Sequence, residues 1–203
     1  MQQKIVQLII LFFPFITIAQ NIGWVYQHMP AELSPILNET QRFELIEYAK
    51  EGRQETIKNK FQGQACMMAY NEQQNYLKVA QTANSTLALK TIPTSASDYL
   101  IIAIHTVSAP ISSSTITIYN KSWQVQKTYQ PSFKTSDFLI MQHNLNEDEL
   151  KDITPIFVSA EFSTTAETIE FTNQTYQILP KKQQKRYLPY LQTYMIPLQQ
   201  ILP

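Results

Sequence analysis

Leu100–Val107 (LIIAIHTV) and Ser114–Tyr119 (STITIY) are the two stretches that decide the fold. The first is apolar at successive positions, which is expected of an interior strand with both faces covered. The second alternates, with isoleucine pointing inward and threonine outward, as in a strand with one buried face. A short polar link follows it. Residues 114–128 are therefore predicted to form a β-hairpin.

The same two-residue period occurs on both sides of these stretches. Apolar and polar residues alternate in Tyr76–Gln81 and again in Leu87–Lys90. A last pair of strands is predicted over residues 156–162 and 169–171. All of this lies after Gly63, where the spacing of apolar residues changes from about 3.6 to 2.

Before Gly63 the pattern is helical. Pro30 is predicted to begin a short helix, because a proline at the first helical position loses no hydrogen bond. A second helix is predicted from Asn38 or Thr40 to about Lys50, with a further helical turn or two over residues 54–61. At the other end of the chain, residues 180–191 favour a short helix broken near Pro189.

This order of elements predicts an α+β fold: N-terminal helices, then an antiparallel β-sheet meander, then a short C-terminal helix. A parallel sheet is disfavoured because no crossover helices separate the strands. The sequence has no internal repeat and no linker. Residues 20–203 are therefore predicted to form a single α+β domain.

Residues 1–19 have the features of a signal peptide. Lys4 gives a basic start, residues 5–19 (IVQLIILFFPFITIA) are mostly apolar, and Thr17 and Ala19 are small residues placed for signal peptidase. The apolar run is shorter than the roughly 20 residues that cross a bilayer. We predict cleavage after Ala19, export to the periplasm or beyond, and no transmembrane span in the mature chain. The alternatives are a retained anchor or a buried core helix.

Composition excludes several classes of function. The chain of 203 residues has 16 basic and 16 acidic side chains, and only three arginines, so it lacks the basic surface of a nucleic-acid-binding protein. Its three glycines are about a fifth of ordinary usage. Phosphate-binding loops and dinucleotide turns need glycine. No nucleotide cofactor is therefore expected.

Cys66 is the only cysteine, so no intrachain disulfide can form. It lies in the apolar stretch Ala65–Ala69 and is predicted to be a small buried side chain rather than a nucleophile. The three histidines, His28, His105 and His143, are isolated, and none stands at a metal-ligand spacing from another or from Cys66. We predict no metal site.

His105 is the strongest catalytic candidate, because it ends the buried strand and precedes a serine-rich stretch. A hydrolase needs a serine beside a histidine that a carboxylate orients, and Asp98 and Asp137 are the available acids. However, the sequence has no nucleophile elbow and no glycine after Gly63. A structural histidine at a strand end is the favoured interpretation, and no catalytic residue is assigned.

Two further patterns are weaker. Asn144, Asn146 and Asp148, followed by Glu149 and Asp152, faintly resemble a calcium loop. The turn glycine and the final bidentate carboxylate of such a loop are missing. We predict instead that Asn146 caps a short helix and that Glu149 completes the capping box.

The only basic cluster lies in the predicted C-terminal helix and consists of Lys181, Lys182, Lys185 and Arg186. A solvated helix face is the favoured interpretation of such a cluster. Binding of an anionic glycan or lipid is the alternative.

A larger set of residues, in this order and spacing, resembles an exported family of Gram-negative gut and oral bacteria known only as a domain of unknown function. The set comprises Met29-Pro30, Leu33, Pro35, Leu37, Arg42, Gly63, Tyr76–Val79, His105-Thr106, Ala109-Pro110, Ser114, Tyr119 and Trp123. The similarity covers about residues 24–125 and is looser beyond. It implies a secreted or periplasmic protein, and it brings no active site, ligand or cofactor with it.

These observations leave three functional hypotheses. The leading one is a non-catalytic domain of the cell envelope that binds a partner or small ligand. The second is a periplasmic carrier of a lipid or other apolar ligand, which requires an apolar cavity of several hundred cubic ångströms between sheet and helices. The third is a hydrolase centred on His105, which requires that histidine within hydrogen-bond reach of a serine and near a carboxylate.

Overall fold

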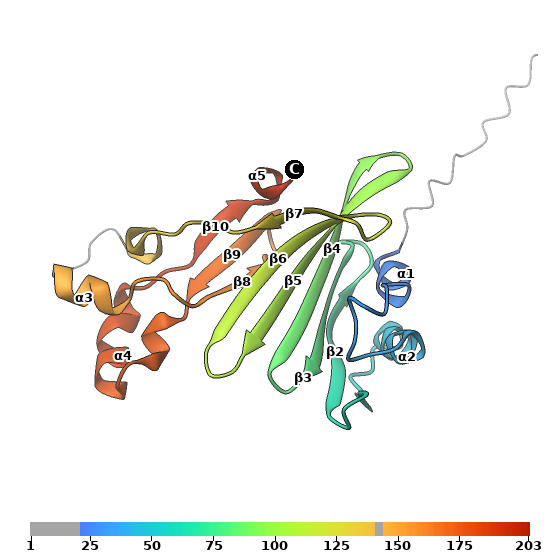
Figure 1. Cartoon of the computed structure of the whole chain (residues 1–203), viewed down its shortest axis with the longest axis horizontal. Coiled ribbons are helices and arrows are strands. Elements are labelled where there is room, and N and C mark those ends of the chain that lie inside the picture. The colour runs from blue at the N-terminus through green and yellow to red at the C-terminus, as the bar shows by residue number, and fades with distance from the viewer. Residues whose placement is uncertain (1–20, 141–143) are drawn as a thin grey trace, which may run out of the picture.

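A computed structural model describes residues 21–140 and 144–203 (Figure 1). The predicted signal peptide, residues 1–19, lies outside the described residues, as does His143. The described chain runs from two N-terminal helices through a large central sheet to a smaller sheet and the C-terminal helices.

A seven-stranded antiparallel sheet forms the centre of the molecule. Its strands lie in chain order, so each strand pairs with its neighbours in the sequence, as the predicted meander requires. They are β1 (Thr56–Lys58), β2 (Gln64–Asn71), β3 (Tyr76–Thr82), β4 (Ser85–Ser95), β5 (Asp98–Ser108), β6 (Ser112–Asn120) and β7 (Val125–Tyr129). The predicted hairpin over 114–128 corresponds to β6 and β7.

Strand β5 is buried on both faces, as its continuous apolar run predicts. Ile101 and Ala103 belong to one hydrophobic core, whereas Ile102 and Ile104 belong to a second core on the opposite face. Successive side chains of a strand point to opposite faces, so the two cores must lie on either side of the sheet. The large sheet is therefore the middle layer of the fold.

The N-terminal helices cover the first face of the sheet. They are α1 (Ile22–Gln27) and α2 (Glu39–Lys50), and they contact strands β1 to β4 (Figure 1). Asn38 caps α2 and forms a reciprocal capping box with Gln41. Of the two predicted caps, Asn38 and Thr40, the structure has Asn38, and the predicted end of this helix near Lys50 is confirmed.

Two other helical predictions are wrong. Pro30 does not begin a helix: residues 28–37 form a loop between the two helices, and the extra helix lies earlier, where the Asn21 side chain accepts the Gly23 N–H. Residues 54–61 contain strand β1 and a turn instead of helical turns. The Asn59 side chain accepts the backbone N–H groups of Phe61 and Gly63, which closes this turn and brings β1 beside β2.

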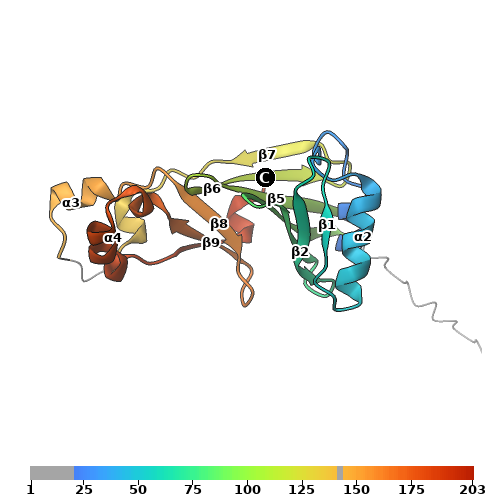
Figure 2. The same cartoon turned by 90° about the horizontal axis from the view of Figure 1, so that it is seen from below.

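A separate three-stranded antiparallel sheet covers the second face. Its strands, in spatial order, are β10 (Tyr194–Pro197), β9 (Thr168–Asn173) and β8 (Val158–Phe162). The inward residues Ala160, Phe162, Ile169, Phe171 and Ile196 join the second core. Figure 2 shows α2 and this small sheet on opposite sides of the large one. The strand pair expected over 156–171 is confirmed, whereas β10 was not predicted.

Short helices complete the C-terminal part. They are α3 (Glu147–Asp152), α4 (Lys181–Tyr187) and α5 (Leu198–Ile201), with 3-10 turns at Thr135–Phe138, Thr175–Ile178 and Leu188–Tyr190. The last turn contains Pro189 and ends the helix that begins at Lys181, as predicted for this tail. A third small core around Leu139, Ile153 and Tyr187 joins these segments.

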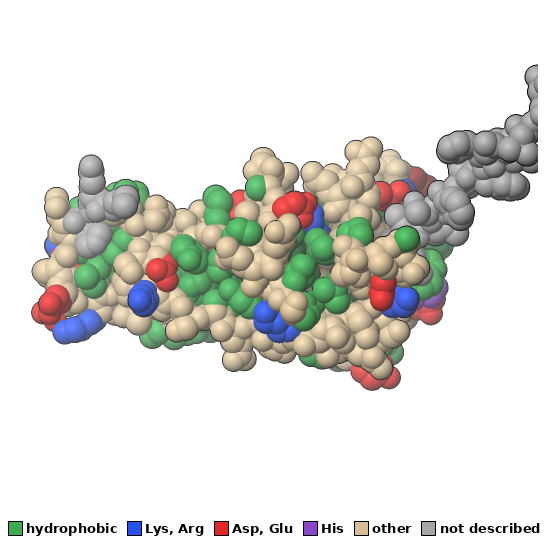
Figure 3. Space-filling model, turned by 90° about the horizontal axis from the view of Figure 1, so that it is seen from above, with side chains coloured by type: hydrophobic (Ala, Val, Ile, Leu, Met, Phe, Trp, Pro, Cys, Tyr) green, Lys and Arg blue, Asp and Glu red, His purple; other side chains and the backbone are tan. Residues whose placement is uncertain are grey.

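The surface carries few charges for its size. Figure 3 shows isolated basic and acidic side chains on a face that is mostly uncharged, with hydrophobic patches between them. Within residues 21–140 and 144–203, no helix is long and apolar enough to cross a membrane.

Candidate functional site

A pocket of about 310 Å³ lies between the loop that joins α1 to α2 and the first face of the large sheet. The loop supplies only apolar side chains, namely Met29, Leu33, Pro35 and Ile36. We call these residues the roof. The sheet supplies Gln81, Leu87, Ala103, His105, Thr115, Thr117 and Tyr119, which we call the floor. Five of the seven floor residues carry hydrogen-bonding groups.

The strand register explains how the floor is assembled. Leu87 of β4 lies opposite His105 of β5, and His105 lies opposite Thr115 of β6. Directly opposed side chains on one face are about 4.5–5.5 Å apart at Cβ, so this row of three forms a continuous surface. Ala103 and Thr117 form the next row along the same strands. Residues far apart in sequence thus meet because the sheet is a regular meander.

The polar side chains of the floor have no internal hydrogen-bond partners. Among the hydrogen bonds of the described residues, none involves a side-chain atom of Gln81, His105, Thr115, Thr117 or Tyr119. The Gln81 residue is only 4% exposed, but its amide atoms are not among the fully buried side-chain atoms that lack a partner, so they remain accessible from the pocket. Polar groups with so little contact with solvent usually have a hydrogen-bond partner, since losing water without a replacement is costly. The floor therefore offers donors and acceptors to whatever enters the pocket.

The pocket is electrically neutral. No Asp, Glu, Lys or Arg belongs to its roof or floor as described. His105 is the one histidine among the lining residues, and its partial burial lowers its pKa below the usual 6.5. Burial disfavours the charged imidazolium, so this ring is neutral at pH 7.

Arg42 holds the roof in place from behind. Its guanidinium donates to the carbonyl oxygens of Gln27 (2.8 and 3.1 Å), Met29 (2.7 Å) and Leu37 (2.7 Å), and the side chain is 3% exposed. The Ser34 hydroxyl also donates to the Leu37 carbonyl at 3.0 Å. A loop of irregular backbone needs such partners when it is buried. These bonds fix the conformation of the loop, so the roof is an ordered part of the fold.

The structure does not assemble the hydrolase constellation around His105. Ser114 lies on the opposite face of the sheet, where its hydroxyl contacts Thr106 at 2.7 Å and accepts the Ala160 N–H at 2.8 Å. Asp98 lies at the far end of the same strand, about 23 Å away at a rise of about 3.3 Å per residue. Asp137 accepts the Lys134 N–H within a separate 3-10 turn.

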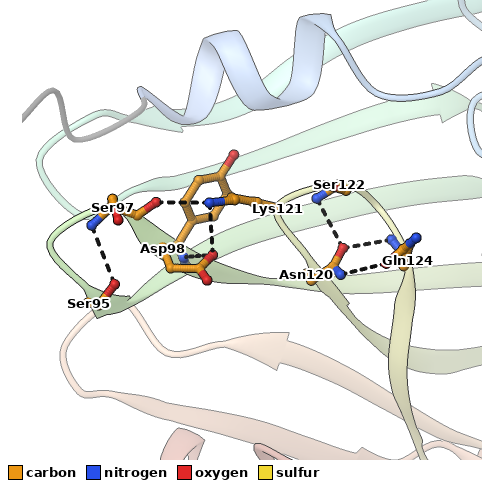
Figure 4. Close-up of polar contacts among 8 residues, drawn as sticks. Ser95, Ser97, Asp98, Asn120, Lys121, Ser122 and Gln124 are labelled. Carbon is orange, nitrogen blue, oxygen red and sulfur yellow. Dashed lines mark hydrogen bonds and ion pairs between the residues drawn. The ribbon is translucent and has the colours of Figure 1, made fainter.

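Asp98 belongs instead to a polar cluster at the turns that follow β4 and β6 (Figure 4). Lys121 lies 3.7 Å from its carboxylate and donates to the Ser97 carbonyl at 3.2 Å. In the next turn, the Asn120 side chain accepts the backbone N–H groups of Ser122 and Gln124. The Lys121 contacts join the two turns and the Asn120 bonds stabilise the second turn, which accounts for the cluster structurally.

A second pocket of about 300 Å³ opens between β6, β7 and β8. Its walls include Phe133, Ile156 and Phe171. The polar Ser114 that lines it is already bonded to Thr106 and Ala160, as described above. Its other polar lining residues are exposed or half-buried, so this pocket has no side chain as deeply buried as Gln81; they are Ser113, Thr115, Thr128, Tyr129 and Gln130.

The remaining sequence candidates are explained by local structure. Asn146 and Glu149 form the predicted capping box of α3 through reciprocal bonds of 3.0 and 2.9 Å. Glu149 also pairs with Arg186 of the basic cluster. Lys181 contacts Gln184, whereas Lys182 and Lys185 are exposed on α4. Asp148 accepts from Lys151 and Asp152 accepts from the Tyr187 hydroxyl, and among the described residues neither belongs to a group of three or more His, Cys, Asp or Glu side chains placed to hold a metal ion.

Neither Cys66 nor His28 lines the pocket. Cys66 was expected to be buried but is only partly so, because it alternates with Ala65 and Met67 and those two residues take the positions in the first core. His28 is exposed, stacks on Trp24 with ring centroids 4.3 Å apart, and lies 3.7 Å from Glu39.

Sequence reasoning singled out His105 but not its neighbours in the pocket. One signal for Gln81 was available, because an amide occupies the inward position that follows Leu77 and Val79 on β3. The alternation in β6 predicts outward positions for Thr115 and Thr117, and in the structure these positions face the pocket. Nothing local marks the roof, because the chain that forms it returns over strands at least 40 residues away.

The fold and pocket define an α+β protein with a large antiparallel meander between a helical layer and a smaller sheet. The chain belongs to the family described as "Protein of unknown function (DUF3256)", whose model matches residues 15–197. This membership agrees with the resemblance to a domain-of-unknown-function family, and the match extends beyond the predicted residues 24–125.

Among solved structures, a domain of an uncharacterized protein from Porphyromonas gingivalis W83 is similar in fold. The TM-score is 0.65 at 17% identity, over 86% of this chain and 90% of that one. At this identity the similarity concerns the fold alone. The comparison with curated proteins found no match.

Proposed function

We propose that this protein is an exported, non-catalytic binding domain of the cell envelope, and that the pocket between roof and floor holds a small ligand. One observation carries the proposal: five hydrogen-bonding side chains converge on a pocket without partners of their own, and one of them, Gln81, is 4% exposed. A concave site with apolar walls and a few convergent polar groups is the usual form of a small-molecule site.

The volume favours a small ligand over a lipid. Ligand pockets generally measure about 300–1,000 Å³, and this one, at about 310 Å³, is at the lower limit. The polar floor also differs from the uniformly apolar lining that a carrier of acyl chains needs. Export is supported by the signal features of residues 1–19.

Blocking the pocket tests the binding proposal. A small-molecule library screened by thermal shift and protein-observed NMR should yield ligands that perturb the amides of Gln81, His105 and Thr117. Replacement of Thr117 by phenylalanine should abolish their binding, because the ring would occupy the space above the floor.

Thr172→Phe is the matched control. Thr172 is a half-buried threonine on β9, on the face of the small sheet turned away from its core. Ligands that bind the wild type and this control but not Thr117→Phe support the pocket. Hits that bind all three proteins equally would place the site elsewhere. N-terminal sequencing of the mature protein tests export, and a start other than Gln20 would contradict the predicted cleavage.

A further inference from the structure

The two sides of the pocket differ in chemistry in a way that restricts its ligand. All four roof residues are apolar, whereas five of the seven floor residues can donate or accept hydrogen bonds. A ligand between them therefore meets carbon on one side and amide, imidazole, hydroxyl and phenol groups on the other. Such a ligand must have an apolar face and a face or edge that carries polar groups.

The lining contains no ionised side chain to balance a charged ligand. Arg42 is a buried cation behind the roof, but its guanidinium is already directed at the carbonyl oxygens of Gln27, Met29 and Leu37. Moving an ion from water into a site without a counter-charge is strongly unfavourable. The neutral state of His105 removes the one remaining cationic group at pH 7.

Gln81 adds a specific requirement. Its amide has one acceptor and two donor hydrogens, and its backbone carbonyl is already bonded to the Asn59 side chain at 2.9 Å. Because the side chain lines the pocket, the partner of the amide is either water or a ligand. A ligand that lacks a complementary polar group would displace this water without replacing its hydrogen bonds, which lowers affinity.

We propose that the pocket selects an uncharged ligand with an apolar face toward Leu33 and Ile36 and a hydroxyl, carbonyl or amide group toward Gln81. This inference rests on the proposed binding function and specifies its ligand class. Anionic ligands such as carboxylates and phosphates, and cationic amines, are selected against. The volume, equal to that of about ten water molecules at about 30 Å³ each, accommodates a two-ring skeleton.

A matched series of probes tests the class. 2-Naphthalenemethanol, 2-naphthoate and 2-naphthylmethylammonium share one skeleton and differ at pH 7 only in the neutral, negative or positive head group. Each is titrated into the purified protein and followed by NMR at the amides of Gln81, His105 and Thr117. We expect the alcohol to bind at least tenfold more tightly than either ion.

Gln81→Leu tests the recognition residue. The substitution replaces an unpartnered buried amide with an apolar group of similar shape, so the protein should fold with undiminished stability. Its affinity for the alcohol should fall at least fivefold. Gln73→Leu is the control, because Gln73 is exposed in the turn between β2 and β3. It should bind the alcohol as the wild type does.

The outcomes separate this inference from the proposal on which it rests. If none of the three probes shifts the pocket amides, and the library screen also gives no ligand there, the binding function itself is refuted. If either ion binds as tightly as the alcohol, the pocket is a site but the inferred ligand class is wrong. If Gln81→Leu binds the alcohol unchanged, the assigned role of Gln81 is overturned.

Discussion

Replacing Arg42 with methionine should destabilise the whole protein and remove the roof of the pocket. Arg42 is buried without a carboxylate partner, and all its bonds go to backbone carbonyl oxygens of the loop between α1 and α2. Methionine keeps much of the side-chain volume but donates nothing. The buried Met29 carbonyl would then lose its side-chain partner, and the Leu37 carbonyl would keep only the Ser34 hydroxyl.

The expected loss follows from these bonds. An unsatisfied buried polar group such as the Met29 carbonyl costs about 1–3 kcal/mol, and loss of the charged hydrogen bond to the Leu37 carbonyl costs about 1.5–3 kcal/mol, which together amount to about 2.5–6 kcal/mol. Relief from burying the arginine charge offsets part of this loss. We therefore expect a decrease of about 3 kcal/mol in the free energy of unfolding, a large fraction of the total of about 5–15 kcal/mol for a typical domain.

Urea unfolding monitored by far-UV circular dichroism measures this change. Arg53→Met is the control, because Arg53 pairs with Glu51 and Glu55 at the surface and its loss should not shift the midpoint measurably. The folded Arg42→Met protein should also lose ligand binding at the pocket. A variant within about 1 kcal/mol of the wild type would refute the view that Arg42 holds the loop.

Three further predictions are independent of Arg42. Burial lowers the pKa of His105 below 6.5, so on acidification the unfolded state binds a proton at this histidine before the folded state does. From about pH 7 to 5, the free energy of unfolding should therefore fall more steeply in the wild type than in His105→Gln. Parallel curves for the two proteins would contradict this. Gly23→Ala should lower the free energy of unfolding by about 1–2 kcal/mol, because the added Cβ would lie 2.6 Å from the Tyr70 hydroxyl and 3.2 Å from Ile46. Urea unfolding of the variant and the wild type measures this difference. Asn146→Ala should lower the free energy of unfolding by about 1 kcal/mol, because the capping box of α3 is lost. The NMR signals of the pocket amides should not shift. A shift there would indicate coupling between α3 and the pocket that the structure does not contain.

Local periodicity was sufficient to predict most of the large sheet. The alternation in β3, β4 and β6 and the continuous apolar run of β5 depend only on which face each side chain occupies, and that is encoded residue by residue. The same holds for α2, whose ends are marked by Asn38 and by Gly52 at a positive φ of 71°. These patterns can be recognised from neighbouring residues alone, without knowledge of the rest of the fold.

The errors occurred where tertiary partners decide local conformation. Thr56–Lys58 is too short to show a strand period and is extended because β2 pairs with it. Pro30 is compatible with a helix, but the Arg42 guanidinium binds carbonyl oxygens on both sides of it and holds the chain as a loop. The weak intrinsic preferences of short segments are readily overridden by such contacts.

The sequence by itself determined the alternating sheet, the capped helix and the scarcity of charge, because each is a property of neighbouring residues. The pairing of β10 with β9, the packing of the small sheet on the large one and the pocket were decided only by the tertiary structure. The roof comes from residues 29–36 and the floor from residues 81–119, so their meeting depends on how distant segments pack. His105 was visible in the sequence as a lone histidine. Its place in a neutral, partly apolar pocket beside the unpartnered amide of Gln81 became apparent only when the strands were in register.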